Sequence, residues 1–250
     1  MMLRNVLLIW LLISFGCSSA TNDQGMVERI IEKHISVTCR DRNGNLPETY
    51  ESEIVEVDPS KNKPLTLRTR AHYPNKMRDD GINDDLILSS GSNGKDVWTV
   101  EVNGKVTVEE GTFRKEMLEI YSELRSIFWN YKENGYAVKL LGTEKIGNTE
   151  CYKIHVRKPS NSWAIVFIDC NTFLMTKKST FSPDSERPDH KIFDCYFSDY
   201  RDVGGIPTCF KEVIDVGSQK KEFKTKWVKY NVEFDDSIFD VPQEADFTHK

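Results

Sequence analysis

Alternating apolar and polar residues are clearest in the middle of the chain, over Ala137–Ile168. Within Glu150–Arg157, apolar residues alternate with charged residues and a histidine, which predicts a strand with one buried and one solvent-facing side. Trp163–Ile168 is apolar at every position, so we expect both faces of that strand to be covered. Gly147-Asn148 is a hairpin signal, because glycine accepts the positive φ of the tight turns. The region is therefore predicted to form an antiparallel meander.

The same pattern recurs on both sides of this meander. Asn103-Gly104 and the glycine pair Gly204-Gly205 are turn signals between such runs. No helix alternates with the strands, which excludes a parallel α/β sheet. With the meander, the pattern predicts about twelve strands; those outside it are Glu48–Val57, Leu65–Tyr73, Leu86–Ser90, Asp96–Val102, Lys105–Glu110, Phe173–Ser179, His190–Tyr200, Cys209–Val216 and Lys220–Phe234.

Two segments show helical spacing. Val27, Ile30, Ile31 and His34 form the apolar stripe of a short helix. Phe113–Lys132 carries a wide apolar face and is predicted to be one long helix, ended by the glycine at Asn134-Gly135. We expect the long helix to lie against the inside of a curved sheet, as a permanent plug or as a lid.

Asn75–Asp85 is an acidic segment with four aspartates around Gly81. Carboxylate oxygens are calcium ligands, but the spacing does not match the twelve-residue calcium loop. We therefore interpret it as a solvated loop and predict no metal site.

The N-terminus predicts export. Val6–Phe15 is an apolar run too short to span a membrane but suited to a signal peptide. Ser14-Phe15-Gly16-Cys17 is similar to a bacterial lipobox, which predicts a signal peptide over 1–16 and lipid attachment at Cys17; cleavage after Ala20 is the alternative. A polar spacer over 17–25, a domain over 26–242 and a polar tail over 243–250 follow. The expected location is the cell envelope, anchored in the outer membrane or periplasmic.

Composition narrows the function. The chain has 250 residues, 38% of them hydrophobic, and a net charge of −5, consistent with one domain. The lysines and arginines are scattered and form no basic face, which argues against nucleic-acid binding. Four of the cysteines suggest two disulfides, Cys151 with Cys170 and Cys195 with Cys209; the alternative is that all are buried apolar thiols. If Arg157 faces Trp163 across the hairpin, Cys151 faces Asp169.

No catalytic motif is present. The nucleophile elbow, the zinc-protease motif, Cys-x-x-Cys and the dinucleotide fingerprint are all missing from the sequence. His190 follows Asp189, which we interpret as a solvated loop pair. We therefore predict a protein that is not an enzyme and needs no cofactor.

Four segments resemble the outer-membrane lipoprotein-sorting carriers, the LolA/LolB-like superfamily, in its lipid-anchored variant. They cover most of the mature chain in order: Asp96-Val-Trp98, Leu141–Gly147 with Cys151–Ile154, Phe197–Ile206, and Asp235–Pro242. The resemblance implies an α+β fold in which a half-open antiparallel β-barrel of about 11–12 strands wraps over one long and one short helix. It also implies an apolar cavity for acyl chains.

The expected function is binding of a lipid or a lipoprotein acyl chain, in the context of lipoprotein sorting. Aromatic and branched side chains suited to lining such a cavity are Trp98, Phe128, Trp163, Ile165 and Phe167. The expected partners are the acyl chain, the membrane through the lipid anchor, and an envelope protein. The alternative is a structural or sensory envelope module that acts through surface loops, namely Asn75–Asp85 and Phe181–Asp189.

Overall fold

Thirteen antiparallel strands form one open sheet in the computed structural model, which describes residues 17–57, 64–83, 86–101, 103–181 and 191–243. The strands are β1 (Thr49–Val57), β2 (Thr66–His72), β3 (Lys76–Asn83), β4 (Leu86–Asn93), β5 (Val97–Val100), β6 (Val106–Val108), β7 (Ala137–Ile146), β8 (Thr149–Arg157), β9 (Trp163–Asp169), β10 (Met175–Phe181), β11 (Lys191–Val203), β12 (Ile206–Asp215) and β13 (Lys220–Tyr230). The predicted α+β half-barrel is confirmed.

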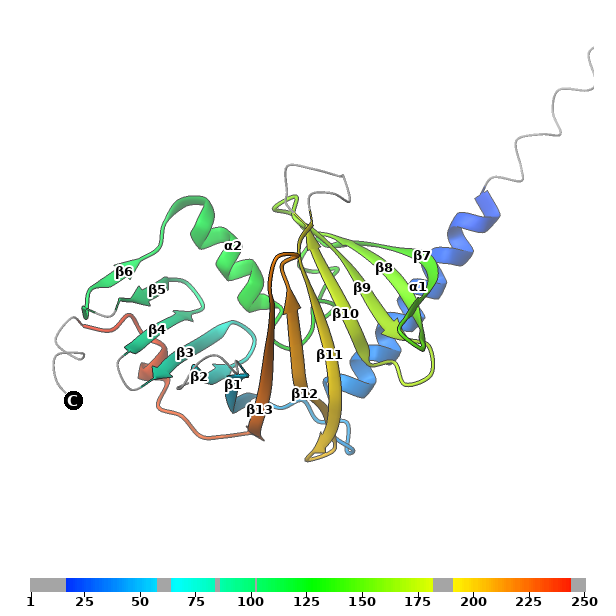
Figure 1. The fold of residues 1–250 in the computed structure, drawn as a ribbon. Helices are drawn as coiled ribbons and strands as arrows, with labels where there is room; N and C mark the ends of the chain where they lie inside the picture. The colour runs from blue at the N-terminus through cyan, green and yellow to red at the C-terminus, as the bar shows by residue number, and fades with distance from the viewer. Residues whose placement is uncertain (1–16, 58–63, 84–85, 102, 182–190, 244–250) are drawn as a thin grey trace, which may run out of the picture.

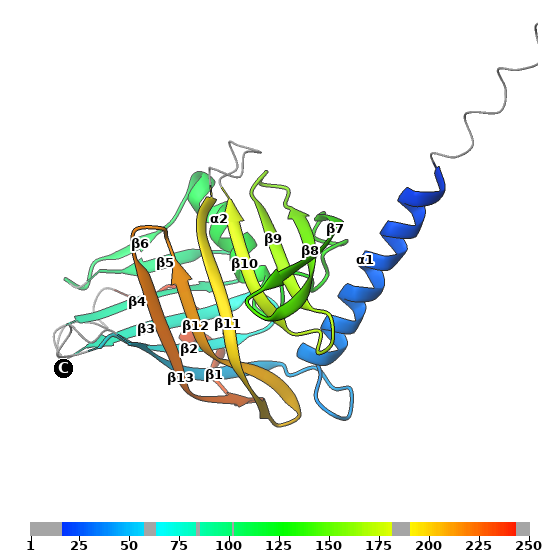
Figure 2. The same ribbon diagram turned by 45° about the vertical axis from the view of Figure 1, so that its right-hand side comes forward.

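Two meanders make up the sheet, β1–β6 and β7–β13, and they join where β1 pairs with β13. Consecutive strands are neighbours within each meander, so short turns suffice as connections. The edge strands β6 and β7 do not pair with each other. The sheet bends round helix α2, and helix α1 lies along the β7–β9 end with its first turns extending beyond the sheet (Figures 1 and 2).

The two helices differ in length from the prediction. α1 spans Cys17–Thr38 and has 22 residues, so the segment expected to be a spacer forms its first turns. α2 spans Gly111–Ser122, only 12 residues. The residues after Glu123 leave the helix in a series of turns, in which the Ser126 hydroxyl accepts the Phe128 N–H at 3.2 Å. Ending α2 early lets the last apolar residues of the predicted helix turn toward α1.

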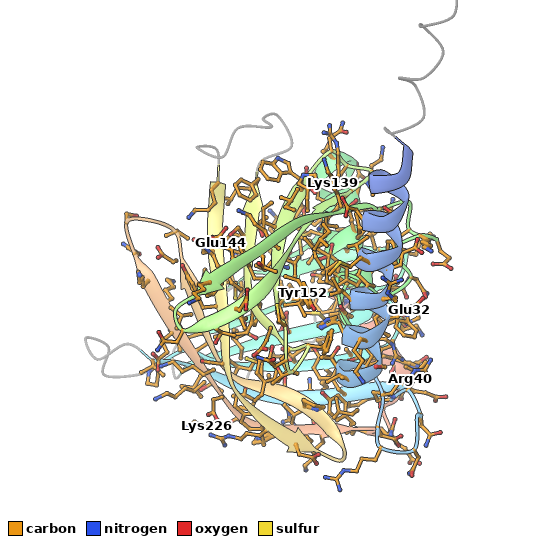
Figure 3. All side chains as sticks on the ribbon, turned by 90° about the vertical axis from the view of Figure 1, so that its right-hand side faces the viewer. Glu32, Arg40, Lys139, Glu144, Tyr152 and Lys226 are labelled. Atoms are coloured by element: carbon orange, nitrogen blue, oxygen red, sulfur yellow. The ribbon has the colours of Figure 1, made fainter. Side chains whose placement is uncertain are left out.

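The core between α1 and the sheet is one apolar cluster. Val27, Ile30 and Ile31 on α1 are buried in it, as the stripe predicted, together with Phe128 and Val166. In Figure 3, α1 stands beside the β7–β8 hairpin, with Tyr152 between them. Burial of these side chains anchors α1 against β7–β9.

β9 has both faces covered, as its sequence predicted. All six residues of Trp163–Ile168 are buried. Ala164, Val166 and Ile168 face α1. Their neighbours Trp163, Ile165 and Phe167 point to the other face and form a second cluster with Phe181, whose ring stacks on Trp163 at 3.7 Å between centroids.

The predicted acidic loop is wrong, because most of it is strand β3. Its carboxylates have partners on neighbouring strands. Asp80 accepts hydrogen bonds from Arg70 Nη1 at 2.7 Å and Ser89 Oγ at 2.6 Å, and Asp79 accepts one from Thr69 Oγ1 at 2.5 Å. Such pairs across strands offset the poor strand propensity of aspartate. The other loop of the alternative function, Phe181–Asp189, lies outside the described residues after Phe181, as does His190.

The registers across β8 and β9 agree with the prediction, because Arg157 pairs with Trp163 and Cys151 with Asp169. Cys39, Cys151, Cys170, Cys195 and Cys209 carry free thiols. Cys209 pairs with Tyr200 while Cys195 pairs with Ile214, so the last two cysteines are staggered by 214 − 209 = 5 residues along the strand pair. The two disulfides stay predictions.

Replacing Asp79 with asparagine should stabilise the protein above pH 6. Burial raises the pKa of Asp79 to about 6, and the neighbouring Asp80 charge adds to the rise. The folded state therefore holds a proton that the unfolded state loses near pH 4, and wild-type stability falls as pH rises between these values. The gain in Asp79→Asn at pH 7.5, measured by urea denaturation, is expected to be at most about 3 kcal/mol.

Asp80→Asn is the control with the opposite sign. Burial opposes ionisation of Asp80, but hydrogen bonds from Ser89 and attraction to Arg78 outweigh it and hold the pKa of Asp80 below its ordinary value. Its loss should therefore destabilise the protein at pH 7.5. A destabilised Asp79→Asn protein at that pH would contradict the interpretation.

Candidate functional site

A cavity of about 320 Å³ lies on the sheet face that carries α1. We call it the inner cavity. Its walls come from β1, β10, β11, β12 and β13, from the C-terminal end of α1, and from Leu124–Ser126, the segment after α2. Its apolar lining includes Ile54, Leu124, Met175, Phe197, Ile206 and Val228. The volume lies at the lower end of the range for small-molecule sites.

His34 holds Leu124–Ser126, the segment after α2, in the wall of this cavity. Its Nδ1 donates to the carbonyl oxygen of Phe173 at 2.8 Å, which leaves Nε2 to accept from the Ser126 hydroxyl at 3.2 Å. Burial lowers the pKa of His34, so the neutral ring is favoured and this tautomer satisfies both contacts. His34 therefore joins α1, the β9–β10 turn and the segment after α2 at the wall of the inner cavity.

Arg125 brings a cation to the lining. Its guanidinium stacks on Tyr73 at 4.0 Å from the ring centroid, and Nη2 donates to the Pro47 carbonyl oxygen at 2.5 Å. Burial lowers the pKa of Arg125, but guanidinium has so high an ordinary pKa that the group keeps its proton. Nη1 is buried without a hydrogen-bond partner in the described part of the chain.

Four tyrosines lie around the inner cavity, and burial raises the pKa of each phenol: Tyr50, Tyr73, Tyr200 and Tyr230. Tyr200 donates to the Met175 carbonyl oxygen at 2.7 Å, and Tyr230 shares a hydrogen bond with Thr208 at 3.0 Å. All four hydroxyls are protonated at neutral pH. The lining is thus amphipathic, with hydroxyl groups set among apolar side chains.

Glu212 is the one carboxylate among the lining residues of the inner cavity. It lies on β12 opposite Phe197 of β11. Burial raises the pKa of its carboxyl above the ordinary value, although the Lys178 ammonium nearby acts in the opposite direction. Its one hydrogen-bond contact in the described residues is the Cys195 thiol, 4.0 Å from Oε2.

None of the five predicted lining residues contributes to the inner cavity. Phe128 is packed in the core against α1. The register links Tyr50 through Ala71, Met77 and Ser92 to Val97 on one face, so Trp98, the next residue, points to the opposite face. There its Nε1 donates to the Phe239 carbonyl oxygen at 3.0 Å, within the 3-10 helix η2 (Asp236–Phe239).

The remaining three, Trp163, Ile165 and Phe167, line a second hollow of about 560 Å³ on the sheet face opposite α1. We call it the outer groove. Charged side chains in its lining include Lys153, Lys177 and Asp194. The sequence identified apolar residues that are buried, but it did not separate the two faces of the sheet.

Solved structures resemble this architecture at low sequence identity. A DUF1329 family protein from Desulfovibrio piger aligns with a TM-score of 0.62 and 13% identity, over 86% of this chain and 97% of the other. A LolA superfamily protein from Nitrosomonas europaea aligns with a TM-score of 0.59 and 11% identity, over 85% and 96%. The chain has the LolA-like fold. No protein-family model matches the sequence, and neither does any curated protein.

A third structure with this LolA-like fold is a domain from Vibrio parahaemolyticus named for outer membrane lipoprotein sorting, with a TM-score of 0.56, 12% identity, and coverage of 88% of this chain and 97% of the other. The TM-scores show a shared fold, while function depends on the site. Among the described residues, neither helix is long and apolar enough to cross a membrane.

Proposed function

We propose that this protein binds the apolar chain of a lipid or lipoprotein in the inner cavity. The observation that carries the proposal is the cavity itself: about 320 Å³ of space between the bent sheet and the helices, with apolar side chains from five strands and from the segment after α2 around it. Transfer of an alkyl chain from water into such a site contributes about 0.8 kcal/mol for each CH₂ group buried. The LolA-like fold of the neighbouring structures supports this choice of ligand.

The proposal also places the protein in the cell envelope. Cys17 would carry the lipid anchor, and the first turns of α1, which begins at that residue, would hold the cavity away from the membrane surface. Export with cleavage after Ala20 is the alternative. The intact mass of the protein made in a bacterial host distinguishes them, because Cys17→Ser removes a lipid-sized mass only in the first case. A sorting role and an outer-membrane location belong to the same proposal.

Filling the cavity should weaken ligand binding. Val228 lines it from β13, so Val228→Phe adds a ring to the cavity space. We expect the uncharged fluorophore N-phenyl-1-naphthylamine to bind the wild type and to lose at least tenfold in affinity in this variant. Lys226→Phe is the matched control, since Lys226 lies on the same strand and is exposed. Binding that is absent from the wild type, or equal in all three proteins, would contradict the proposal.

A further inference from the structure

The polar residues of the inner cavity carry information about its ligand. A site for hydrocarbon alone needs no ionisable group, and burying an unpaired carboxyl costs stability. Glu212 nevertheless lies among Ile54, Phe197 and Val228 in the lining. Its placement therefore calls for a partner that the described protein does not supply.

The contacts of Glu212 leave one oxygen available. The weak thiol contact from Cys195 reaches Oε2, and no residue in the described part of the chain donates a hydrogen bond to Oε1. The ammonium that lowers the pKa of Glu212, on Lys178, is paired with a different carboxylate, with Nζ 3.9 Å from Glu123 Oε2. Glu212 thus has an unfilled acceptor position beside the cavity space.

Besides Arg125 Nη1, another polar group without a partner lies in the same lining. The phenol of Tyr50 contacts the rings of Tyr73 and Tyr230 at 5.8 and 6.5 Å between centroids, but its hydroxyl makes no hydrogen bond with the described residues. Burial raises the pKa of the Tyr50 phenol, and Tyr50 and Glu212 both line the inner cavity. Together Glu212 and Tyr50 offer a hydrogen-bond acceptor and a hydroxyl group beside aromatic rings.

We propose that the ligand of the inner cavity is an amphiphile whose buried polar end is a hydrogen-bond donor, an amine or a hydroxyl, bound by Glu212 Oε1. This inference rests on the proposed function and specifies its ligand. A donor at this position satisfies the carboxyl oxygen, while the alkyl part of the ligand contacts Phe197, Ile206 and Val228. An amine makes the stronger, charge-assisted bond, and the tyrosine rings attract a cation in addition.

The test compares three probes with an unbranched ten-carbon chain and different polar ends. Decylamine, decanol and methyl decanoate are used to displace N-phenyl-1-naphthylamine from the wild type, Glu212→Leu and Glu212→Gln. We expect decylamine or decanol to bind the wild type at least tenfold more tightly than methyl decanoate. Glu212→Leu should remove this preference. Glu212→Gln keeps an acceptor oxygen without the charge, so it should weaken the amine tenfold but spare the alcohol, which tells the two donors apart.

Glu222→Leu and Glu222→Gln are the controls, because Glu222 is paired with Lys211 at 2.7 Å and is not part of the cavity lining. Both should keep the wild-type preference. An unchanged ratio between the donor probes and methyl decanoate in Glu212→Leu would overturn the inference and leave lipid binding intact. If the fluorophore itself does not bind, the proposed function fails as well.

Discussion

Replacing Trp98 with alanine is expected to lower the free energy of unfolding by about 4 kcal/mol, near the middle of the range for large aromatic side chains in a core. Trp98 and Phe239 are both fully buried. The indole fills space that Gly91 leaves open, since a Cβ at Gly91 would lie 2.5 Å from Trp98 Cζ2. Its loss removes both this contact and the hydrogen bond that holds η2 to the sheet. Urea denaturation measures the change.

The release of η2 gives this prediction a local readout. In Trp98→Ala the amide of Ile238, which donates to the Asp235 carbonyl oxygen at 3.1 Å, should exchange its hydrogen faster relative to amides of β8. Trp227→Ala is the matched control: that ring is partly exposed and contacts Arg68 at 5.9 Å from the ring centroid, so about 1 kcal/mol is expected. A smaller loss for Trp98→Ala than for Trp227→Ala would contradict the structural role given to Trp98.

The strands were readable from the sequence where side chains alternate and glycine marks the turns. Gly147 and Gly104 both have positive φ, at 60° and 82°, as the hairpin signals required. β3 was missed because Arg78, Asp79 and Asp80 are consecutive polar residues. Its partners lie on β2 and β4, and a run of polar residues does not reveal which of them will be paired across strands.

The length of α2 shows the limit of helical periodicity. Ile127, Phe128 and Tyr131 continue the apolar spacing of Phe113–Ser122, so local sequence favours one long helix. In the fold these residues reach the α1 cluster only if the chain turns after Glu123. The tertiary contact outweighs the local preference, which is weak at each residue.

The polar residues of the inner cavity have no sequence signal in common. Tyr50 and Glu212 come from strands of different meanders, and the pairing of β1 with β13 brings those meanders together. A single glutamate in an alternating strand is most simply interpreted as part of the solvent-facing side, and a single tyrosine as part of the apolar core. The resemblance to the lipoprotein-sorting carriers predicted that a cavity exists. Which ionisable residues line that cavity could be identified only from the structure.

Glu123 is expected to be the most sensitive ionisable residue, and Glu123→Ala should lower the free energy of unfolding by about 4 kcal/mol. Glu123 is the C-cap of α2, where its negative charge opposes the helix dipole. It pairs there with Lys158 and accepts from the Tyr136 hydroxyl at 3.2 Å. The Lys158 side chain is only 10% exposed, so removing Glu123 leaves a buried ammonium without its closest counter-charge.

Two further variants test whether burial of the Glu123–Lys158 ion pair explains this loss. Glu123→Leu combined with Lys158→Met should recover most of the lost stability, because an apolar pair of similar volume needs no counter-charge. Glu101→Ala removes an exposed ion pair with Lys105 and should cost less than about 1 kcal/mol. The Glu101 and Lys105 side chains are 48% and 62% exposed.

Glu123 also precedes Leu124–Ser126 in the cavity wall, so Glu123→Ala should weaken fluorophore binding as well, while the double variant restores it. Recovery of stability without recovery of binding would show that the charge itself, and not the position of the segment, shapes the inner cavity.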